Sequence, residues 1–202
     1  MKILFALIIL SLSFAVVSAQ NEQAPIVEKD FTYKDWVYKN VITGTDMNLR
    51  KFTNGKKLVM VVYFAPWCPN WKHDAAFVQG LYEKYKGNGF DVIGVGEYDP
   101  VSAMKTHLDA FKITFPAVYE SVLRTDKDKT LHYEYRKAVG DTRKWGSPWY
   151  VFLEPEKLEK DSLILSKKAS FVNGELIKDQ AENFIRAKLG LPRMYSISRH
   201  NR

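Results

Sequence analysis

The sequence predicts a single α/β domain with a mixed central β-sheet that is flanked by helices on both faces. Three observations lead to this fold class. Continuous apolar runs, typical of buried strands, alternate with segments whose apolar residues recur every three or four positions. Turn signals such as Asn54-Gly55 and Gly87-Asn88-Gly89 separate them. The last strand, turn and strand depart from this alternation, so we expect the sheet to be mixed rather than wholly parallel.

The first residues have the layout of a secretory signal peptide. A positive start at Met1-Lys2 precedes an apolar run over 3–17, and Val17-Ser18-Ala19 offers small residues for cleavage. The apolar run is shorter than the roughly 18–20 residues that a bilayer crossing needs. We therefore expect an exported protein cleaved after about Ala19, with an uncleaved N-terminal anchor as the alternative. The predicted organisation is a signal peptide at 1–19, a loose N-terminal segment at 20–30, the domain at 31–190 and a basic C-terminal tail at 191–202.

The domain itself reads as an ordered series of elements. The segment Phe31–Val41 favours one or two short strands, and the unbroken apolar run Leu58–Phe64 favours a central strand that is buried on both faces. Pro69 suits the first turn of the helix that follows. The remaining expected elements are a strand at 90–95, a helix from Pro100 onward, a strand at 113–119, a helix near 131–137, strands at 149–153 and 164–172, and a last helix that ends before Gly190.

Charge and metal-binding residues exclude several kinds of function. The net charge is +7, but the 30 Lys and Arg are scattered, which favours a solvated basic surface. Export argues against nucleic acid as a partner, and leaves the membrane only through an uncleaved signal segment or weak contact with the basic surface. The four histidines have no metal-ligand spacing and are expected on the surface, and one cysteine cannot build a structural zinc site. We therefore predict neither a metal nor a cofactor.

The single cysteine, Cys68, stands where a buried strand gives way to a helix. Unpaired N–H groups at a helix start favour negative charge, so a cysteine there is predicted to be an accessible, readily ionised nucleophile. A packed, inert cysteine is the alternative. Having one cysteine also excludes an internal disulfide in the mature chain.

The segment Phe64-Ala65-Pro66-Trp67-Cys68-Pro69 resembles the active-site turn of thioredoxin-like proteins. The order of Leu81–Tyr85, Phe90–Val95 and Ile113–Pro116 resembles the exported redoxin or TlpA-type branch of that superfamily. Gly146-Ser147-Pro148 matches the position of the family's cis-proline, which lies beside the active-site cysteine. The resemblance covers roughly Phe31 to Leu189 and implies a thioredoxin-like fold. It implies Cys68 as the catalytic residue, with Trp67, Pro69, Asn70 and Trp71 completing the active-site motif.

Two departures from the family pattern bear on the chemistry. In two-cysteine members a second cysteine would occupy position 71, where this chain has Trp71. The acidic or polar residue that the family often carries six residues before the first cysteine is Val62 here. Without a resolving thiol to deprotonate, a buried carboxylate at that position would only cost stability. The site is therefore predicted to be adapted to one thiol.

Tryptophans and the proline loop supply the expected binding surface. The resemblance implies that Trp67, Trp71 and Trp149 surround the sulfur, where exposed aromatic rings would favour an apolar or peptide partner. The alternative is that Trp71 and Trp149 are ordinary core residues. Ser147, Pro148 and Trp149 are the expected substrate-binding residues, with the backbone of Ser147 offering an edge to an extended peptide.

Three functions remain open at this point. The first is a monothiol thiol–disulfide oxidoreductase or isomerase, whose partners are protein or peptide thiols and disulfides and an external reducing thiol. The second is a binding or chaperone-like module that keeps the fold without turnover. The third is a thiol peroxide reductase that forms a sulfenic acid resolved by an outside thiol.

Overall fold

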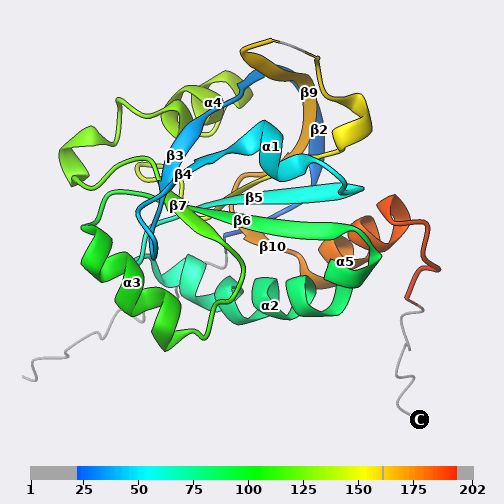
Figure 1. Ribbon diagram of the computed structural model, residues 1–202, viewed down its shortest axis with the longest axis horizontal. Helices are drawn as coiled ribbons and strands as arrows, with labels where there is room; N and C mark the ends of the chain where they lie inside the picture. The colour runs from blue at the N-terminus through cyan, green and yellow to red at the C-terminus, as the bar shows by residue number, and fades with distance from the viewer. Residues whose placement is uncertain (1–21, 161, 195–202) are drawn as a thin grey trace, which may run out of the picture.

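The computed structural model describes residues 22–160 and 162–194 (Figure 1). The predicted signal peptide and the end of the basic tail lie outside these residues. None of the helices in the described ranges is long and apolar enough to cross a membrane.

An eight-stranded mixed sheet forms the middle layer, in the order β2-β9-β8-β5-β6-β7-β3-β4. A separate parallel pair joins β1 to β10 near the N-terminus. The strands are β1 (Gln23–Ala24), β2 (Val27–Lys34), β3 (Val37–Asn40), β4 (Asp46–Asn48), β5 (Leu58–Phe64), β6 (Phe90–Gly96), β7 (Ala117–Tyr119), β8 (Trp149–Leu153), β9 (Ile164–Val172) and β10 (Glu175–Leu176).

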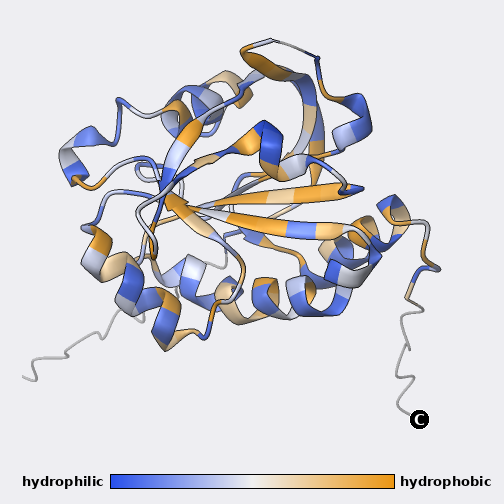
Figure 2. Ribbon diagram, viewed as in Figure 1, coloured by the Kyte–Doolittle hydropathy of each residue, from blue (hydrophilic) through white to orange (hydrophobic). Residues whose placement is uncertain are grey.

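Helices cover both faces of this sheet, as the fold class predicts (Figure 1). α2, α3 and α5 pack on one face, which contains the core around Trp71 and Met104, and α1 and α4 pack on the other. The helices are α1 (Leu49–Thr53), α2 (Pro69–Tyr85), α3 (Val101–Ala110), α4 (Leu131–Val139) and α5 (Lys178–Lys188). Both cores rest on the apolar strands at the centre of the sheet, which Figure 2 shows along β5 and β6.

Strand β5 fixes the position of the candidate site. Every residue of β5 is buried, because β6 and β8 flank it in the sheet and its side chains enter the cores on both faces. Tyr63 near the end of β5 therefore lies opposite Trp149 at the start of β8. This register brings the turn after β5 next to the loop before β8, so that Cys68 and Ser147-Pro148 meet.

Several elements differ from the prediction, including β4, which the sequence did not indicate. The segment 20–30 is not wholly loose, because β1 pairs with β10 and β2 begins at Val27 against β9. The first four residues of β2 are exposed and three of them are charged. Backbone pairing and contacts such as the Glu28–Lys168 ion pair hold them, so the sequence carries no apolar signal there. The short helix α1 was not predicted. β7 is limited to Ala117–Tyr119, since Lys112 adopts a positive φ of 52° and Phe115 turns into the core.

Candidate functional site

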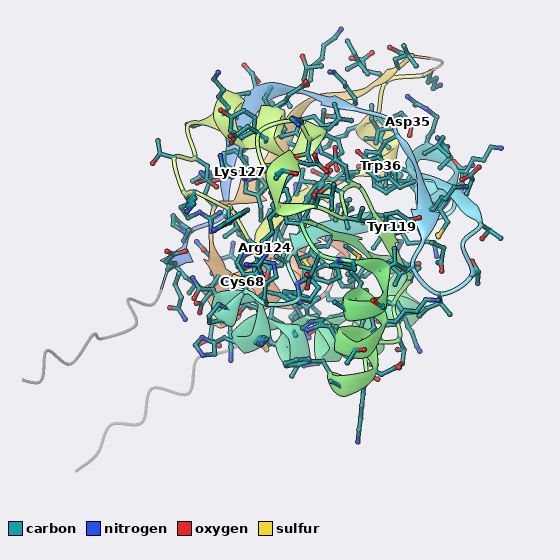
Figure 3. The ribbon with its side chains drawn as sticks, turned by 90° about the vertical axis from the view of Figure 1, so that its left-hand side faces the viewer. Asp35, Trp36, Cys68, Tyr119, Arg124 and Lys127 are labelled. Atoms are coloured by element: carbon teal, nitrogen blue, oxygen red, sulfur yellow. The ribbon has the colours of Figure 1, made fainter. Side chains whose placement is uncertain are left out.

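Cys68 caps the N-terminus of α2. Its backbone is extended, with φ −71° and ψ 121°, and Pro69 occupies the first helical turn. The Cys68 N–H donates to the carbonyl of Ala65 at 2.9 Å, which closes the turn after β5. The side chain makes no capping hydrogen bond. The N–H groups of the first helical turn are therefore not capped by the side chain of Cys68. Figure 3 shows Cys68 at this end of α2.

The loop before β8 supplies the polar partner of the sulfur. The peptide bond between Ser147 and Pro148 is cis, as the family resemblance implies. The Cys68 thiol donates to the carbonyl of Ser147 at 3.1 Å. The Ser147 hydroxyl in turn accepts from the N–H of Ala65 at 2.9 Å. Two hydrogen bonds therefore fix the proline loop against the cysteine turn.

Cys68 is less accessible than predicted. Only 7% of the residue is exposed, and the proline loop lies directly against the sulfur. A cavity of about 230 Å³ remains beside the sulfur. Its lining comes from the cysteine turn, the proline loop and the first described residue of the chain, namely Glu22, Trp67, Cys68, Pro69, Asn70, Arg143, Lys144, Trp145, Gly146 and Ser147.

The tryptophans are arranged differently from the expected ring around the sulfur. Trp71 and Trp149 are both fully buried, and Trp149 lies in the core on the opposite face of the sheet from Cys68. Neighbouring residues of a strand point to opposite faces, so Tyr150 rather than Trp149 faces the cysteine side. The half-buried rings at the cavity are Trp67 and Trp145, which meet edge to face at 5.1 Å. Trp145 was missed because it belongs to no motif.

Trp71, where the family resemblance implies a second cysteine, is hydrogen-bonded to a histidine. Its indole Nε1 donates to Nε2 of His107 on α3 at 2.7 Å. Burial, reinforced by the charge of Lys72, lowers the pKa of His107 from its ordinary 6.5 to about 4, so the ring is neutral and able to accept. The expectation that the histidines lie on the surface is wrong for His107 and His132, since both are buried.

A protein-family model matches the part of the chain that contains Cys68 and the proline loop. The family model for Redoxin matches residues 20–152, about two thirds of the chain. The chain belongs to the redoxin family. This agrees with the resemblance carried by the cysteine turn and the proline loop.

The names of other proteins similar to this redoxin refer to thiol–disulfide chemistry. The thiol-disulfide oxidoreductase ResA of Oceanobacillus iheyensis is 23% identical over 115 residues, which is 56% of this chain. The match spans about 60% of the length of that relative.

Solved structures confirm the thioredoxin-like fold. A thioredoxin-family thiol:disulfide interchange protein from Chlorobium tepidum has a TM-score of 0.57 at 16% identity, over 80% of this chain and 98% of that one. A secreted thiol-disulfide isomerase from Corynebacterium glutamicum has a TM-score of 0.59 at 14% identity, over 81% of this chain and 92% of that one.

An acid that sequence reasoning missed lies farther along α2 of this redoxin. Val62 is buried and apolar, so it supplies no base. Asp74, which carries a carboxyl group, is almost fully buried as well. Asp74 accepts from the Tyr150 hydroxyl at 2.6 Å and from the N–H of Leu176 at 2.8 Å. Burial raises the pKa of Asp74 despite these bonds.

A buried ionic network supports the proline loop from behind. Arg136 on α4 donates to the carbonyl of Arg143 at 2.9 Å and lies 3.6 Å from Asp141. Arg143 binds the same carboxylate through Nη2 at 2.7 Å and donates to the carbonyl of Pro148 at 3.1 Å. Gly146, at φ +59°, is required because a Cβ would lie 2.1 Å from the Arg136 side chain. The ionic network thus holds the loop, together with the packing of Trp145 against Trp67 and Tyr98.

Two further titratable groups are buried beside this network. Glu97 and His132 are fully buried, with Glu97 Oε1 3.7 Å from His132 Nδ1. Burial, with the nearby charge of Glu120, raises the pKa of Glu97 well above its usual range. Burial and the charge of Arg136 lower the pKa of His132 well below its usual range. His132 is therefore neutral near pH 7, and burial favours the protonated form of Glu97. Within residues 22–160 and 162–194, no cluster of three or more potential ligands could hold a metal ion.

Proposed function

We propose that this redoxin is an exported monothiol thiol–disulfide oxidoreductase or isomerase that acts through Cys68. The observation that carries the proposal is the 3.1 Å hydrogen bond between the Cys68 thiol and the Ser147 carbonyl of the cis-proline loop. The reacting sulfur thus lies against a backbone edge that an extended peptide can use. Pro69, at the start of α2, leaves the helix N-terminus directed toward the charge that develops on the sulfur.

The reaction begins with loss of the Cys68 proton to solvent. The thiolate attacks one sulfur of a substrate disulfide, and a Cys68–substrate S–S bond forms as the substrate S–S bond breaks. The departing substrate sulfur takes the electron pair and a proton, so it is reduced as Cys68 is oxidised to the mixed disulfide. Ser147 and Pro148 are the proposed substrate-binding residues. Trp149 is buried on the other face, and its proposed part is limited to anchoring the start of β8.

Release distinguishes this site from a two-cysteine site. Trp71 fills the position from which a resolving thiol would attack, and its ring is hydrogen-bonded to His107. The mixed disulfide is therefore cleared only by the substrate's own second thiol, which gives isomerisation, or by an external thiol, which gives reduction. Without either, the adduct persists.

Export and domain organisation are part of the same proposal. The apolar N-terminal run supports a signal peptide over 1–19, and the C. glutamicum protein of the same fold is described as secreted. The domain is proposed to begin near β1 rather than at residue 31, since β1 and β2 pair with β10 and β9.

One observation favours the second candidate, a binding or chaperone-like module without turnover. The Cys68 residue exposes only 7% of its surface, so a substrate disulfide reaches the sulfur only after the covering residues move. A binding module needs no contact between its partner and the sulfur, although Ser147, at 5% exposed, is covered as well.

Intact mass spectrometry decides between the two. The mature protein, incubated with a peptide disulfide and no reductant, is expected to gain the mass of one peptide half. Cys68→Ser should gain none, and Ser162→Ala serves as an exposed control of similar size that leaves the site unchanged. Peptide binding that is equal for wild type and Cys68→Ser, with no covalent adduct, would reject the proposed enzyme and favour the binding module.

A further inference from the structure

We infer that the cavity beside Cys68 contains a carboxylate-binding subsite, formed by Asn70 and Arg143 and occupied at rest by Glu22, and that the substrate is a disulfide with an acidic residue next to its reacting cysteine. The inference rests on the proposed function and names the substrate class. In this account, the substrate carboxylate displaces Glu22 from the subsite as the disulfide approaches the sulfur.

The carboxylate of Glu22 lines the cavity and contacts both proposed subsite residues. Its Oε2 accepts from Asn70 Nδ2 at 2.9 Å and lies 3.6 Å from Nη1 of Arg143. Asn70 directly follows Pro69 at the start of α2, so the carboxylate also lies at the positive end of that helix. Glu22 is exposed, so a competing carboxylate in solution can reach the same donors.

The backbone around Glu22 is anchored, whereas its side chain is only loosely bound. The carbonyl of Glu22 accepts from the N–H of Glu175 at 3.0 Å, and β1 then pairs with β10 over two residues. Gly174 makes this approach possible, because a Cβ there would lie 2.0 Å from the Glu22 carbonyl oxygen. Glu22 thus lines the cavity beside Cys68, and few interactions hold its side chain there, which a substrate carboxylate can replace.

The cavity has more donors than acceptors. Asp141 occupies Nε and Nη2 of Arg143, but Nη1 is buried and has no hydrogen-bond partner among the described residues. The indole Nε1 of Trp67, another lining residue, is likewise buried without an acceptor within residues 22–160 and 162–194. Unpaired buried donors are costly, and a carboxylate would satisfy them.

The surrounding charges favour the same ligand. Lys144 lines the cavity, and the guanidinium of Arg124 lies 4.8 Å from the centre of the Trp67 ring. Figure 3 places Arg124 on the same side of the molecule as Cys68. Glu22 is the one acidic residue among the described residues that line the cavity. An acidic substrate therefore gains charge complementarity, and a basic one loses it.

The test uses three disulfide peptides that differ only at the residue next to cysteine, which is Glu, Gln or Lys. The rate of adduct formation with Cys68 is measured by mass spectrometry at low salt. We expect the Glu peptide to react about tenfold faster than the Lys peptide, which corresponds to about 1.4 kcal/mol. Added salt should reduce this ratio, because part of the attraction is between solvent-exposed charges.

Variants separate the subsite from general charge effects. Asn70→Ala should remove most of the preference for the Glu peptide, and Glu22→Gln should speed its reaction severalfold by removing the resident carboxylate. Glu28→Gln is the matched control, since it makes the same change on exposed β2, where Glu28 pairs with Lys168. Gly174→Ala should displace Glu22 without a change of charge and give the same increase as Glu22→Gln.

The outcomes distinguish the two proposals. If no peptide forms an adduct, the proposed function fails. If all three peptides form adducts at equal rates, or if Glu28→Gln acts like Glu22→Gln, the subsite is wrong while the monothiol function stands.

Discussion

The two sides of the Cys68 site differ in chemistry: apolar side chains line the helix side, and a buried ionic network supports the loop side. On the helix side, apolar residues surround the cysteine, and the indole N–H of Trp71 is satisfied by the hydrogen bond to His107. On the loop side, the cis-proline segment rests on Arg136, Asp141 and Arg143, of which Arg136 and the Asp141 carboxylate are almost fully buried.

The difference indicates which half of the site carries specificity. A bulky neutral ring where a second thiol would stand leaves the helix side with one reactive group. The loop side retains a buried ionic network, which is expensive to build and fixes the backbone that faces the sulfur. We propose that the helix side is adapted to a single thiol and that the loop side is maintained for partner binding.

The largest expected effect comes from breaking the ionic network. Arg136→Met should destabilise the protein by about 3–5 kcal/mol, because the carbonyl of Arg143 loses its buried donor and the Asp141 carboxylate keeps only Arg143 as a charged partner. Urea unfolding measures the change, and Arg193→Met, at an exposed position, is the control. A loss below about 1 kcal/mol would show that the network does not hold the loop.

A smaller effect is expected on the helix side. Trp71→Phe keeps most of the ring volume but removes the indole donor, which leaves the buried Nε2 of His107 unpaired. The expected loss is about 1–3 kcal/mol. The double variant Trp71→Phe with His107→Leu should recover part of it, since neither polar partner remains. Equal losses for the single and double variants would mean that the hydrogen bond contributes nothing.

The pH dependence of stability sharpens the comparison. His107 has a pKa of about 4 in the folded protein and an ordinary value of 6.5, so between these values the unfolded chain binds more protons. Stability should therefore fall as the pH drops from 6.5 to 4, with a contribution of about 1 kcal/mol per pH unit from this residue. His107→Gln, which keeps an acceptor for Trp71, should flatten that part of the profile. An unchanged profile would contradict a neutral, buried His107.

Glu97, on the loop side, should act in the opposite direction. Its raised pKa means that the folded protein retains a proton which the unfolded chain releases above about pH 4.5, the ordinary value. The stability that Glu97 contributes is present at low pH and is lost as the pH rises toward the pKa of Glu97 in the folded protein. Glu97→Gln should therefore reduce the loss of stability toward alkaline pH. Chemical denaturation of both proteins from about pH 5 to 9 measures it, and parallel curves would refute the assignment.

The central elements were predictable because their side chains carry the signal. The apolar run Leu58–Phe64 is a strand buried on both faces, and the apolar spacing after Pro69 matches α2. Cys68 and the cis bond at Pro148 followed from motifs that the family shares. These features depend on residues that are close in sequence or on a recognised pattern.

The remainder of the site depends on long-range contacts that leave no local pattern. Trp71 and His107 are 36 residues apart, and Glu22 reaches Asn70 across 48. The expectation that Trp149 lies beside the sulfur was wrong, because the alternation of side chains along β8 directs Tyr150, not Trp149, toward the cysteine. Strand β2 was missed at its start because backbone pairing, not side-chain hydrophobicity, holds its charged residues at the sheet edge.

The central claim is that a single thiol, with Trp71 in place of a resolving cysteine, makes this redoxin retain its mixed disulfides. The most direct measurement is the lifetime of the Cys68–peptide adduct in wild type and in Trp71→Cys, followed by mass spectrometry without added thiol after free peptide is removed. The wild-type adduct should persist until an external thiol is added. Trp71→Cys should clear its adduct by intramolecular attack and end with a disulfide between Cys68 and the introduced thiol, faster still when Val62→Asp supplies a base. A wild-type adduct that clears spontaneously as fast as the adduct of Trp71→Cys would contradict the claim.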